Sequence, residues 1–527
     1  MKHARFSLLL LASILLCAPL VAAPQQMQDQ HPDHAKHAPV AIPPETAART
    51  QHSVTIDGHV IKYTATAGTL LLHNRKGQVI GSMFYIAYTR NGEQADHRPV
   101  TFAYNGGPGA ASALVDIGGF GPMHVVWPVP GGDPRAAQPP YALEPNPYSI
   151  LKSTDLVFID AMGTGYSRIV GKGAPKDFYG VSEDARAFAQ FIQRYLSVNH
   201  RWNSPKFLLG ESYGTTRNAV LANDLVDAGV NLNGVIMCST GLDFLTIDNA
   251  PGNDLPFISY LPSYAAIAWY HHRLNPMPPS LPALVKQVEQ FAGTTYAQAL
   301  FKGATLPATE KQKLAAQLSA YTGLPASLWL KADLRVPLSV FQRNVMGNGT
   351  MTGRYDERFT TYELQPLKQQ QGYGNIGASS RAFNGGLTAG MNRYLAENLK
   401  YHTRLPYLQE GRIHKWNWNY RPPMGGEDMG FGAGPATCCG TNVAPALARA
   451  MSNDPAMQLM MNNGYYDTAT PFFGTIYTLH HMGLPAALEK NVHWFFYPVG
   501  HMLYLNPKVL PKVDANIDAF IENASAK

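Results

Sequence analysis

The chain has 527 residues, of which 45% are hydrophobic and 15% are charged, and its net charge is +6. This apolar fraction suffices for a large folded core and excludes disorder over most of the chain. The 47 glycines and 40 prolines exclude a long coiled coil. The positive charge is spread thinly, without a dense Lys/Arg run, so we expect no nucleic-acid partner.

Residues 1–23 have the pattern of a secretory signal peptide. Two basic residues precede an apolar run over residues 6–16, and the small residues Ala22 and Ala23 suit cleavage. The run is short for a membrane anchor, and no later segment is long and apolar enough to form a membrane span. We therefore expect an exported protein, periplasmic or secreted.

Residues 24–52 are predicted to be a flexible N-terminal segment, rich in Gln, His, Pro and Ala. His31, His34 and His37 recur every three residues there. A solvated arm explains this spacing better than metal capture does.

The four cysteines do not define a disulfide framework. Cys17 lies in the leader, where bulky Leu16 before it disfavours a lipoprotein site. Cleavage would leave Cys238, Cys438 and Cys439. Either the adjacent pair closes on itself or one of the two pairs with Cys238. No CxxC pair is present, so a zinc site lacks its usual ligands and we expect no metal.

An α/β core is predicted in two parts, residues 53–243 and 431–527. The first part opens with β-rich runs, and buried-type strands then alternate with amphipathic helices. The strands are expected at residues 60–64, 69–72, 83–88, 100–104, 155–159, 207–209 and 235–238, and the helices at 182–196 and 215–228. In the second part we expect strands at 458–461 and 493–497 and a helix at 472–481. Such alternation predicts an α/β fold with a mostly parallel, covered sheet.

Residues 244–430 interrupt this alternation and are predicted to be a largely helical inserted lid. Helical spacing is visible at residues 281–291, 310–321 and 326–334, with Gly/Pro-rich stretches between them. Gly372 to Gly377 match GxGxxG, but a polar Gln run precedes them instead of a strand, so we interpret them as a loop. No cofactor is expected.

The segment Gly210-Glu211-Ser212-Tyr213-Gly214 matches GxSxG between an expected strand and an expected helix. In this context the turn is tight and lifts the serine hydroxyl clear of the sheet. The N-terminus of the following helix favours a developing negative charge. We therefore predict that Ser212 is a nucleophile, against the alternative of an ordinary strand-to-helix turn.

A serine nucleophile needs a histidine base and a carboxylate that orients it. In this kind of sheet the chain order is Ser, then Asp or Glu, then His. Asp467 and His501 follow the two late strands, at the same carboxyl edge as Ser212. His480 and His481 fall within an expected helix and are weaker candidates.

The oxyanion of an acyl-transfer reaction needs two N–H donors. One is the backbone N–H of Tyr213, which follows the nucleophile. The other is expected from an early glycine-rich loop after a strand, and Asn105-Gly106-Gly107-Pro108-Gly109 fits this description.

Four segments together resemble the serine carboxypeptidases, and the bacterial exported branch of that family in particular. They are Asn105 to Gly109, Phe158-Ile159-Asp160 with Gly163 to Ser167, Gly210 to Gly214, and Gly500-His501-Met502. The resemblance covers roughly residues 60–520 and is weak through the lid. It implies an α/β-hydrolase fold with a lid, and removal of C-terminal residues from peptide substrates.

The resemblance also implies roles for individual residues. The matching positions are Ser212, Asp467 and His501 for the triad, Gly107 and Tyr213 for the oxyanion hole, and Asn105, Gly106 and Glu211 for the carboxylate of the substrate's C-terminus. Two close carboxyl groups do not both ionise cheaply, so Glu211 should bind such a substrate best when protonated.

The chain departs from the family at three places. Ala110 stands where eukaryotic members often have Cys, Ala103-Tyr104 replaces a usual Trp-x, and Gly118-Gly119 lie where some relatives have an acidic residue. The alternative functions are an esterase or acyltransferase on the same triad and, from a different class, a binding module that retained the fold without catalysis.

Overall fold

The computed structural model describes residues 40–132, 137–362, 377–421 and 440–526. The predicted signal peptide, most of the predicted flexible segment, and Cys17, Cys438 and Cys439 lie outside these ranges. Cys238 is buried and its thiol is free. Within the described ranges, no helix combines the length and the apolar character that crossing a membrane requires.

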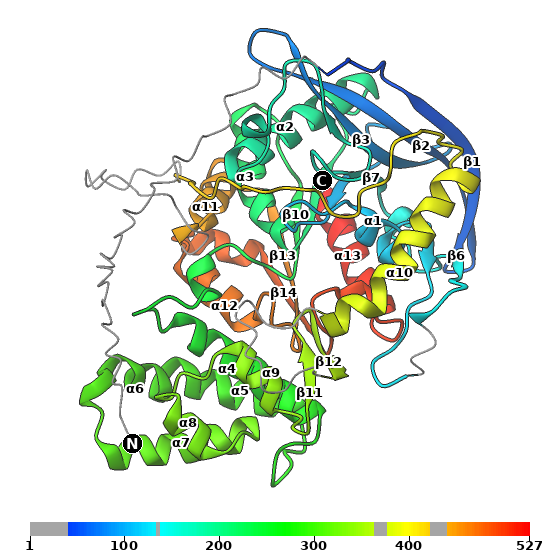
Figure 1. The fold of residues 1–527 in the computed structure, drawn as a ribbon. Helices are drawn as coiled ribbons and strands as arrows, with labels where there is room; N and C mark the ends of the chain where they lie inside the picture. The colour runs from blue at the N-terminus through cyan, green and yellow to red at the C-terminus, as the bar shows by residue number, and fades with distance from the viewer. Residues whose placement is uncertain (1–39, 133–136, 363–376, 422–439, 527) are drawn as a thin grey trace, which may run out of the picture. The chain divides into compact units, whose positions relative to one another are not determined.

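A large mixed sheet organises the described chain. Its long strands are β1 (Ala47–Ile56), β2 (His59–His73), β3 (Val79–Arg90), β4 (Val100–Tyr104), β7 (Asp155–Ile159), β9 (Lys206–Glu211), β10 (Gly234–Cys238), β13 (Gln458–Gly464) and β14 (Val492–Tyr497). They lie in the order β1-β2-β3-β7-β4-β9-β10-β13-β14 (Figure 1). Pairing is antiparallel from β1 to β7 and parallel from β7 to β14. The predicted α/β-hydrolase fold is confirmed.

The strand β1 was not predicted. It starts at Ala47, so the last residues of the segment expected to be flexible belong to the sheet. Its middle is Thr50-Gln51-His52-Ser53, a polar stretch without the apolar pattern from which a strand is predicted. The strand lies at the sheet edge. Pairing with β2 over its whole length stabilises β1.

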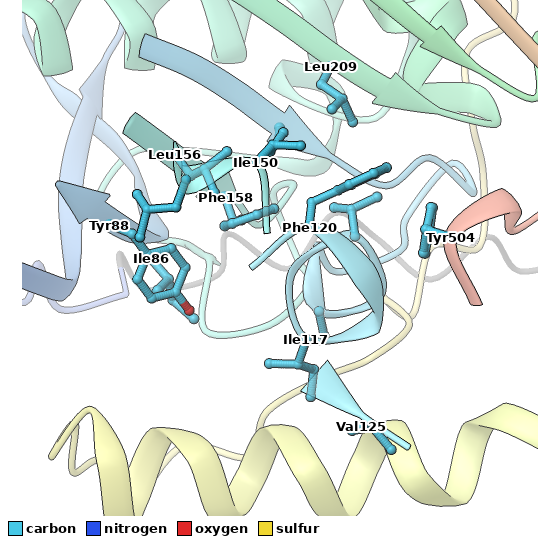
Figure 2. Close-up of a cluster of buried hydrophobic side chains, with 14 of the residues drawn as sticks. Ile86, Tyr88, Ile117, Phe120, Val125, Ile150, Leu156, Phe158, Leu209 and Tyr504 are labelled. Atoms are coloured by element: carbon cyan, nitrogen blue, oxygen red, sulfur yellow. The ribbon is translucent and has the colours of Figure 1, made fainter. Parts of the chain in front are cut away.

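Helices cover both faces of the sheet, as parallel strands require. One face carries α2 (Val181–Val198), α3 (Tyr213–Asp227) and α11 (Ala444–Asn453), and the other carries α1 (Ala113–Val115), the π-helical turn η1 (Asp116–Phe120) and α13 (Leu510–Ser525). Side chains alternate along each strand, so Leu156 and Phe158 of β7 enter one core and Val157 and Ile159 the other. Figure 2 shows Leu156 and Phe158 with Phe120 and Tyr504 in the first of these cores. Burying each such large side chain contributes about 1.5–3 kcal/mol.

The insertion contains a helical unit with its own core. Its helices are α4 (Leu255–Tyr270), α5 (Leu281–Phe291), α6 (Ala297–Lys302), α7 (Ala308–Thr322), α8 (Ala326–Lys331) and α9 (Leu338–Asn344). The three helices expected from sequence are α5, α7 and α8. Tyr264 stacks on Phe341 with ring centroids 3.9 Å apart, so this aromatic residue of the insertion serves core packing.

The insertion also contains a hairpin and a long helix that the sequence did not predict. The hairpin is β11 (Thr350–Gly353) with β12 (Asp356–Tyr362), and the helix is α10 (Gly377–Arg393). The later core elements include α12 (Phe472–His481), which matches the predicted helix. The short strands β5 (Met123–Val125), β6 (Leu143–Pro145) and β8 (Arg168–Ile169) complete the strands of the described ranges.

An ion-pair cluster attaches α13 to the body of the protein. The Lys152 ammonium lies 3.2 Å from Asp514, 2.8 Å from Asp518 and 2.8 Å from Asp57. Asp514 and Asp518 are both buried. Burial is the larger cause and repulsion from Asp518 the second cause that raise the pKa of Asp514 to about 8. The cluster therefore depends on Lys152 to compensate two buried carboxyl groups.

Replacing Lys152 with Met should lower the free energy of unfolding at pH 8 by about 2–4 kcal/mol, because removing one partner leaves buried charge uncompensated. Lys152 lowers the raised pKa of Asp514, so removing Lys152 raises that pKa further, and the added cost appears only at pH values where the carboxyl is ionised in the folded parent. The loss should therefore be smaller at pH 5. Urea unfolding of Lys152→Met at pH 5 and pH 8 measures this loss in the free energy of unfolding. Lys152→Arg, which retains the charge, is the control. Equal midpoints for Lys152→Met and the parent protein at pH 8 would contradict this role.

Candidate active site

Ser212 occupies the turn between β9 and α3. Its backbone has φ 59° and ψ −126°, a strained conformation for a residue other than glycine, and its side chain is partly accessible. Tyr213 is the first residue of α3, so its N–H has no acceptor within that helix. The turn thus presents a hydroxyl and an N–H donor at the carboxyl end of β9, as the GxSxG segment predicted.

Asp467 and His501 are hydrogen-bonded to each other. The distance from His501 Nδ1 to Asp467 Oδ2 is 2.8 Å, and both side chains are buried. Asp467 also accepts hydrogen bonds from the N–H groups of Ala469 and Thr470, at 2.7 and 3.0 Å, and from the Thr470 hydroxyl at 2.7 Å. These bonds hold the carboxylate in one orientation, which fixes the imidazole tautomer with the proton on Nδ1.

The other ring nitrogen, His501 Nε2, is buried and makes no hydrogen bond among the described residues. The imidazole and Ser212 line the same pocket. Burial lowers the pKa of His501, but the charge and hydrogen bond of Asp467 and the charge of Glu211 together outweigh burial, and the pKa lies above its ordinary value. The ring therefore has a nitrogen without a hydrogen bond at a pocket that Ser212 also lines, and its protonated form is stabilised.

The loop from Asn105 to Gly109 packs directly on the Ser212 turn. A Cβ atom on Gly106 would overlap the backbone nitrogens of Tyr213 and Gly214, so only glycine permits this approach. Gly107 lines the pocket beside Ser212. The two peptide units predicted to form an oxyanion hole therefore belong to segments in contact.

A buried arginine anchors this loop. Arg217 of α3 donates to the Asn105 carbonyl at 2.8 Å and pairs with Asp184 of α2 at 2.6 Å. Its guanidinium lies over the Phe188 ring, 4.1 Å from the centroid. Arg217 was not predicted from the sequence. Its position five residues after Ser212, on the helix expected to follow the GxSxG segment, is the signal that could have identified it.

Asn105 and Glu211 form one polar group. Asn105 Nδ2 donates to Glu211 Oε2 at 2.8 Å and contacts the Tyr504 hydroxyl at 3.3 Å, while Asn105 Oδ1 accepts from the Val115 N–H at 2.9 Å. Glu211 Oε1 lies 3.4 Å from His501 Nε2. Burial raises the pKa of Glu211, although His501 and the Asn105 hydrogen bond oppose the shift. Glu211 therefore holds a proton to higher pH than an exposed glutamate.

The pocket at this site has a volume of about 450 Å³. Asn105, Gly107, Glu211, Ser212 and His501 line one side of it. The insertion supplies the other side, through Tyr355 of the hairpin turn, Ser380, Phe383, Asn384, Leu387 and Thr388 of α10, and Gln409 and Glu410. The α10 residues recur at helical spacing, which was the one sequence signal that could have identified this wall.

Tyr504 is a second residue that sequence reasoning missed. Its ring is buried near Phe120, with the centroids 4.9 Å apart, and its hydroxyl reaches Asn105. It thus supports Asn105 and lies against Gly118 and Gly119, in the region where the sequence lacks the acidic residue of some relatives. Among the described residues, no group of three or more His, Cys, Asp or Glu side chains is arranged to hold a metal ion.

Comparison with protein families agrees with the motifs. A family model described as serine carboxypeptidase matches residues 65–256. The predicted resemblance to serine carboxypeptidases is confirmed over this range, and the match supports a hydrolase of the serine peptidase type. The matched range contains the Asn105 loop and Ser212, whereas Asp467 and His501 lie beyond it. No curated protein matches the chain significantly.

Solved structures that match the chain include several hydrolases. Proline iminopeptidase of Mycobacterium smegmatis is 13% identical with a TM-score of 0.34, and the match covers 90% of this chain and 99% of that one. A peroxisomal alpha-beta-hydrolase of Saccharomyces cerevisiae is 9% identical with a TM-score of 0.33, covering 91% and 90%. An epoxide hydrolase mutant from Aspergillus niger is 12% identical with a TM-score of 0.31, covering 88% and 79%.

The geometry predicts the reactivity of Ser212. A fluorophosphonate should label the protein at Ser212, and Asp467→Asn should slow labelling by about 10³- to 10⁴-fold, because the amide no longer holds the Nδ1–H tautomer. Mass spectrometry of the labelled peptide measures the rate. As a control, Asp333→Asn changes an exposed acid of the insertion and should leave the rate unaltered. Labelling of Asp467→Asn at the parental rate would exclude an Asp467–His501 relay.

Proposed function

We propose that this protein is an exported serine carboxypeptidase that releases C-terminal residues from peptides. The observation that carries the proposal is the convergence, at one pocket, of Ser212, the Asp467–His501 pair and the Asn105–Glu211 group. The family match over residues 65–256 supports the same class of reaction. Export rests on the signal-peptide pattern of the leader.

In the proposed mechanism Ser212 Oγ attacks the carbonyl carbon of the last peptide bond and gives its proton to His501 Nε2. The N–H groups of Gly107 and Tyr213 stabilise the oxyanion of the tetrahedral intermediate. Nε2 then protonates the departing amine, and the C–N bond breaks to leave an acyl-enzyme. Water attacks the ester with Nε2 as base, and the peptide acid leaves with Ser212 regenerated.

Recognition of the substrate's C-terminus is assigned to Asn105, Gly106 and Glu211. A protonated Glu211 donates a hydrogen bond to the substrate carboxylate, whereas an ionised Glu211 repels it. The raised pKa of Glu211 extends the proton-bound form towards neutral pH. Burial of the Glu211 carboxyl thus favours the protonated form that binds the substrate carboxylate.

The substrate class is tested with a matched pair of blocked dipeptides, one with a free C-terminal carboxylate and one with a C-terminal amide. The free acid should be cleaved with at least a tenfold higher kcat/KM at acid pH, since it alone gains a hydrogen bond to a charged group. Ser212→Ala should abolish both activities. Cleavage of blocked esters with no preference for the free acid would favour an esterase, and transfer to an added alcohol would favour an acyltransferase.

The pH dependence is predicted to separate KM from kcat. KM for the free-acid peptide should rise as the pH rises through the raised pKa of Glu211, while KM for a blocked ester stays flat. For both substrates kcat should fall as the pH falls through the raised pKa of His501, because Nε2 must be unprotonated.

The matched variants are Glu211→Gln, which keeps a donor, and Glu211→Ala, which does not. Glu211→Gln should make KM for the peptide independent of pH. Glu211→Ala should raise that KM roughly 10- to 100-fold, the effect of one lost hydrogen bond to a charged group. Identical KM profiles for peptide and ester in the parent enzyme would refute the role of Glu211.

A further inference from the structure

The turn of the β11–β12 hairpin lies against the two loops that carry Asp467 and His501. This hairpin belongs to the insertion, and none of the four sequence motifs comes from it. Only Arg354 and Tyr355 separate its strands.

Tyr355 contacts His501 through both its side chain and its backbone. The two rings stack with centroids 5.2 Å apart and planes at 27°. The His501 N–H donates to the Tyr355 carbonyl at 2.5 Å. A Cβ atom on Gly500 would overlap the Tyr355 carbonyl oxygen and Asp356, so glycine before the histidine is required for the hairpin to come this close.

An ion pair secures the hairpin on the same loop. The Arg358 guanidinium bonds to Asp356 at 2.6 Å and donates to the Pro498 carbonyl at 3.0 Å. Both side chains of the pair are nearly buried, at 8% and 9% exposed, so water competes little for these bonds. The hairpin is therefore attached on both sides of Gly500.

The same turn bonds to the loop of Asp467. The Arg354 carbonyl accepts from the Thr468 N–H at 3.2 Å and from the Thr468 hydroxyl at 3.0 Å. The Glu357 N–H donates to the Tyr466 carbonyl at 3.2 Å. The residues on both sides of Asp467 are thus fixed by the hairpin that also fixes His501.

These contacts restrain a motion that the Asp467–His501 hydrogen bond leaves open. A single bond at Nδ1 permits the imidazole to tilt about that bond, and tilting moves Nε2 away from Ser212. An aromatic ring stacked on one face limits the tilt. Tyr355 lines the same pocket as His501, so its ring also forms part of the cavity wall.

We propose that the β11–β12 hairpin belongs to the active site. In this proposal Tyr355 positions His501 and forms part of the wall of the substrate pocket. The inference rests on the proposed triad, but it assigns to the insertion a role in chemistry as well as in specificity. It predicts that the aromatic ring matters and that the phenolic hydroxyl does not.

The test compares Tyr355→Phe, Tyr355→Leu and Tyr355→Ala, with Tyr362→Ala as the matched control. Tyr362 lies at the far end of the same strand and is 85% exposed. Tyr355→Phe should retain kcat within about twofold, and Tyr355→Leu and Tyr355→Ala should lose about 10- to 100-fold in kcat, as misplacing a reacting group does. Tyr362→Ala should behave as the parent.

A pH profile separates positioning from general destabilisation. The charged and titratable groups that face His501 are Asp467, Glu211 and Arg354, and all remain in these variants. Without the ring, water reaches the imidazole, and since burial lowers the pKa of His501, its apparent pKa should rise. The acid limb of kcat should then move to higher pH in Tyr355→Ala and stay in place in Tyr355→Phe.

Three results would overturn the proposal: a parental kcat in both Tyr355→Leu and Tyr355→Ala, an equal loss in Tyr355→Phe, or a lowered kcat with an unmoved acid limb. If Tyr355→Ala fails to fold by urea unfolding, Tyr355→Leu carries the same test. Fluorophosphonate labelling and the Ser212→Ala control are independent of these variants. Failure of the positioning role is therefore distinguishable from failure of the proposed function.

Discussion

The close packing of the Asn105–Gly109 loop on the Ser212 turn is the contact on which the candidate site depends. It brings Gly106 against the backbone nitrogens of Tyr213 and Gly214 and sets Asn105 beside Glu211. Only a residue without a side chain fits at Gly106, and Arg217 holds the Asn105 carbonyl from below. Both the proposed oxyanion hole and the proposed carboxylate-binding group thus depend on a single backbone approach.

Buried charge is concentrated around this contact, and each group has a partner that offsets its desolvation. Arg217 has Asp184 and an aromatic ring, and Asp467 has two N–H groups, a hydroxyl and the imidazole. Glu211 has the Asn105 amide and the charge of His501 as partners, and burial still raises its pKa above the ordinary value. Strain and desolvation at such places are common where a protein's chemistry resides.

Much of the core could be predicted because local sequence determines it. The runs at β7 and β10 are continuous and apolar, as strands buried on both faces are, and GxSxG marks the turn after β9. Asp467 and His501 were predicted from their order in the chain and their positions after strands. Because the strands are parallel, their carboxyl ends lie at the same edge of the sheet, which brings the two residues close together. In each case a periodic pattern or a short motif corresponds directly to the structural feature.

The insertion was less predictable because its role arises from tertiary contacts alone. Tyr355 lies in a two-residue turn with no motif. Its proposed positioning role comes from stacking on His501, 146 positions later in the sequence. Tyr504 looks like any core tyrosine until its hydroxyl is seen beside Asn105. The strand β1 was hidden by polar residues at a sheet edge, where one face needs no apolar pattern.

The most direct measurement is a crystal structure of the protein with a peptide phosphonate that ends in a free carboxylate, a mimic of the tetrahedral intermediate. The account predicts a covalent bond from phosphorus to Ser212 Oγ, a phosphonyl oxygen at the N–H groups of Gly107 and Tyr213, and the carboxylate on Asn105, Gly106 and Glu211. A ligand bonded to Ser212 with its carboxylate directed to solvent or to another part of the pocket would contradict the carboxypeptidase assignment.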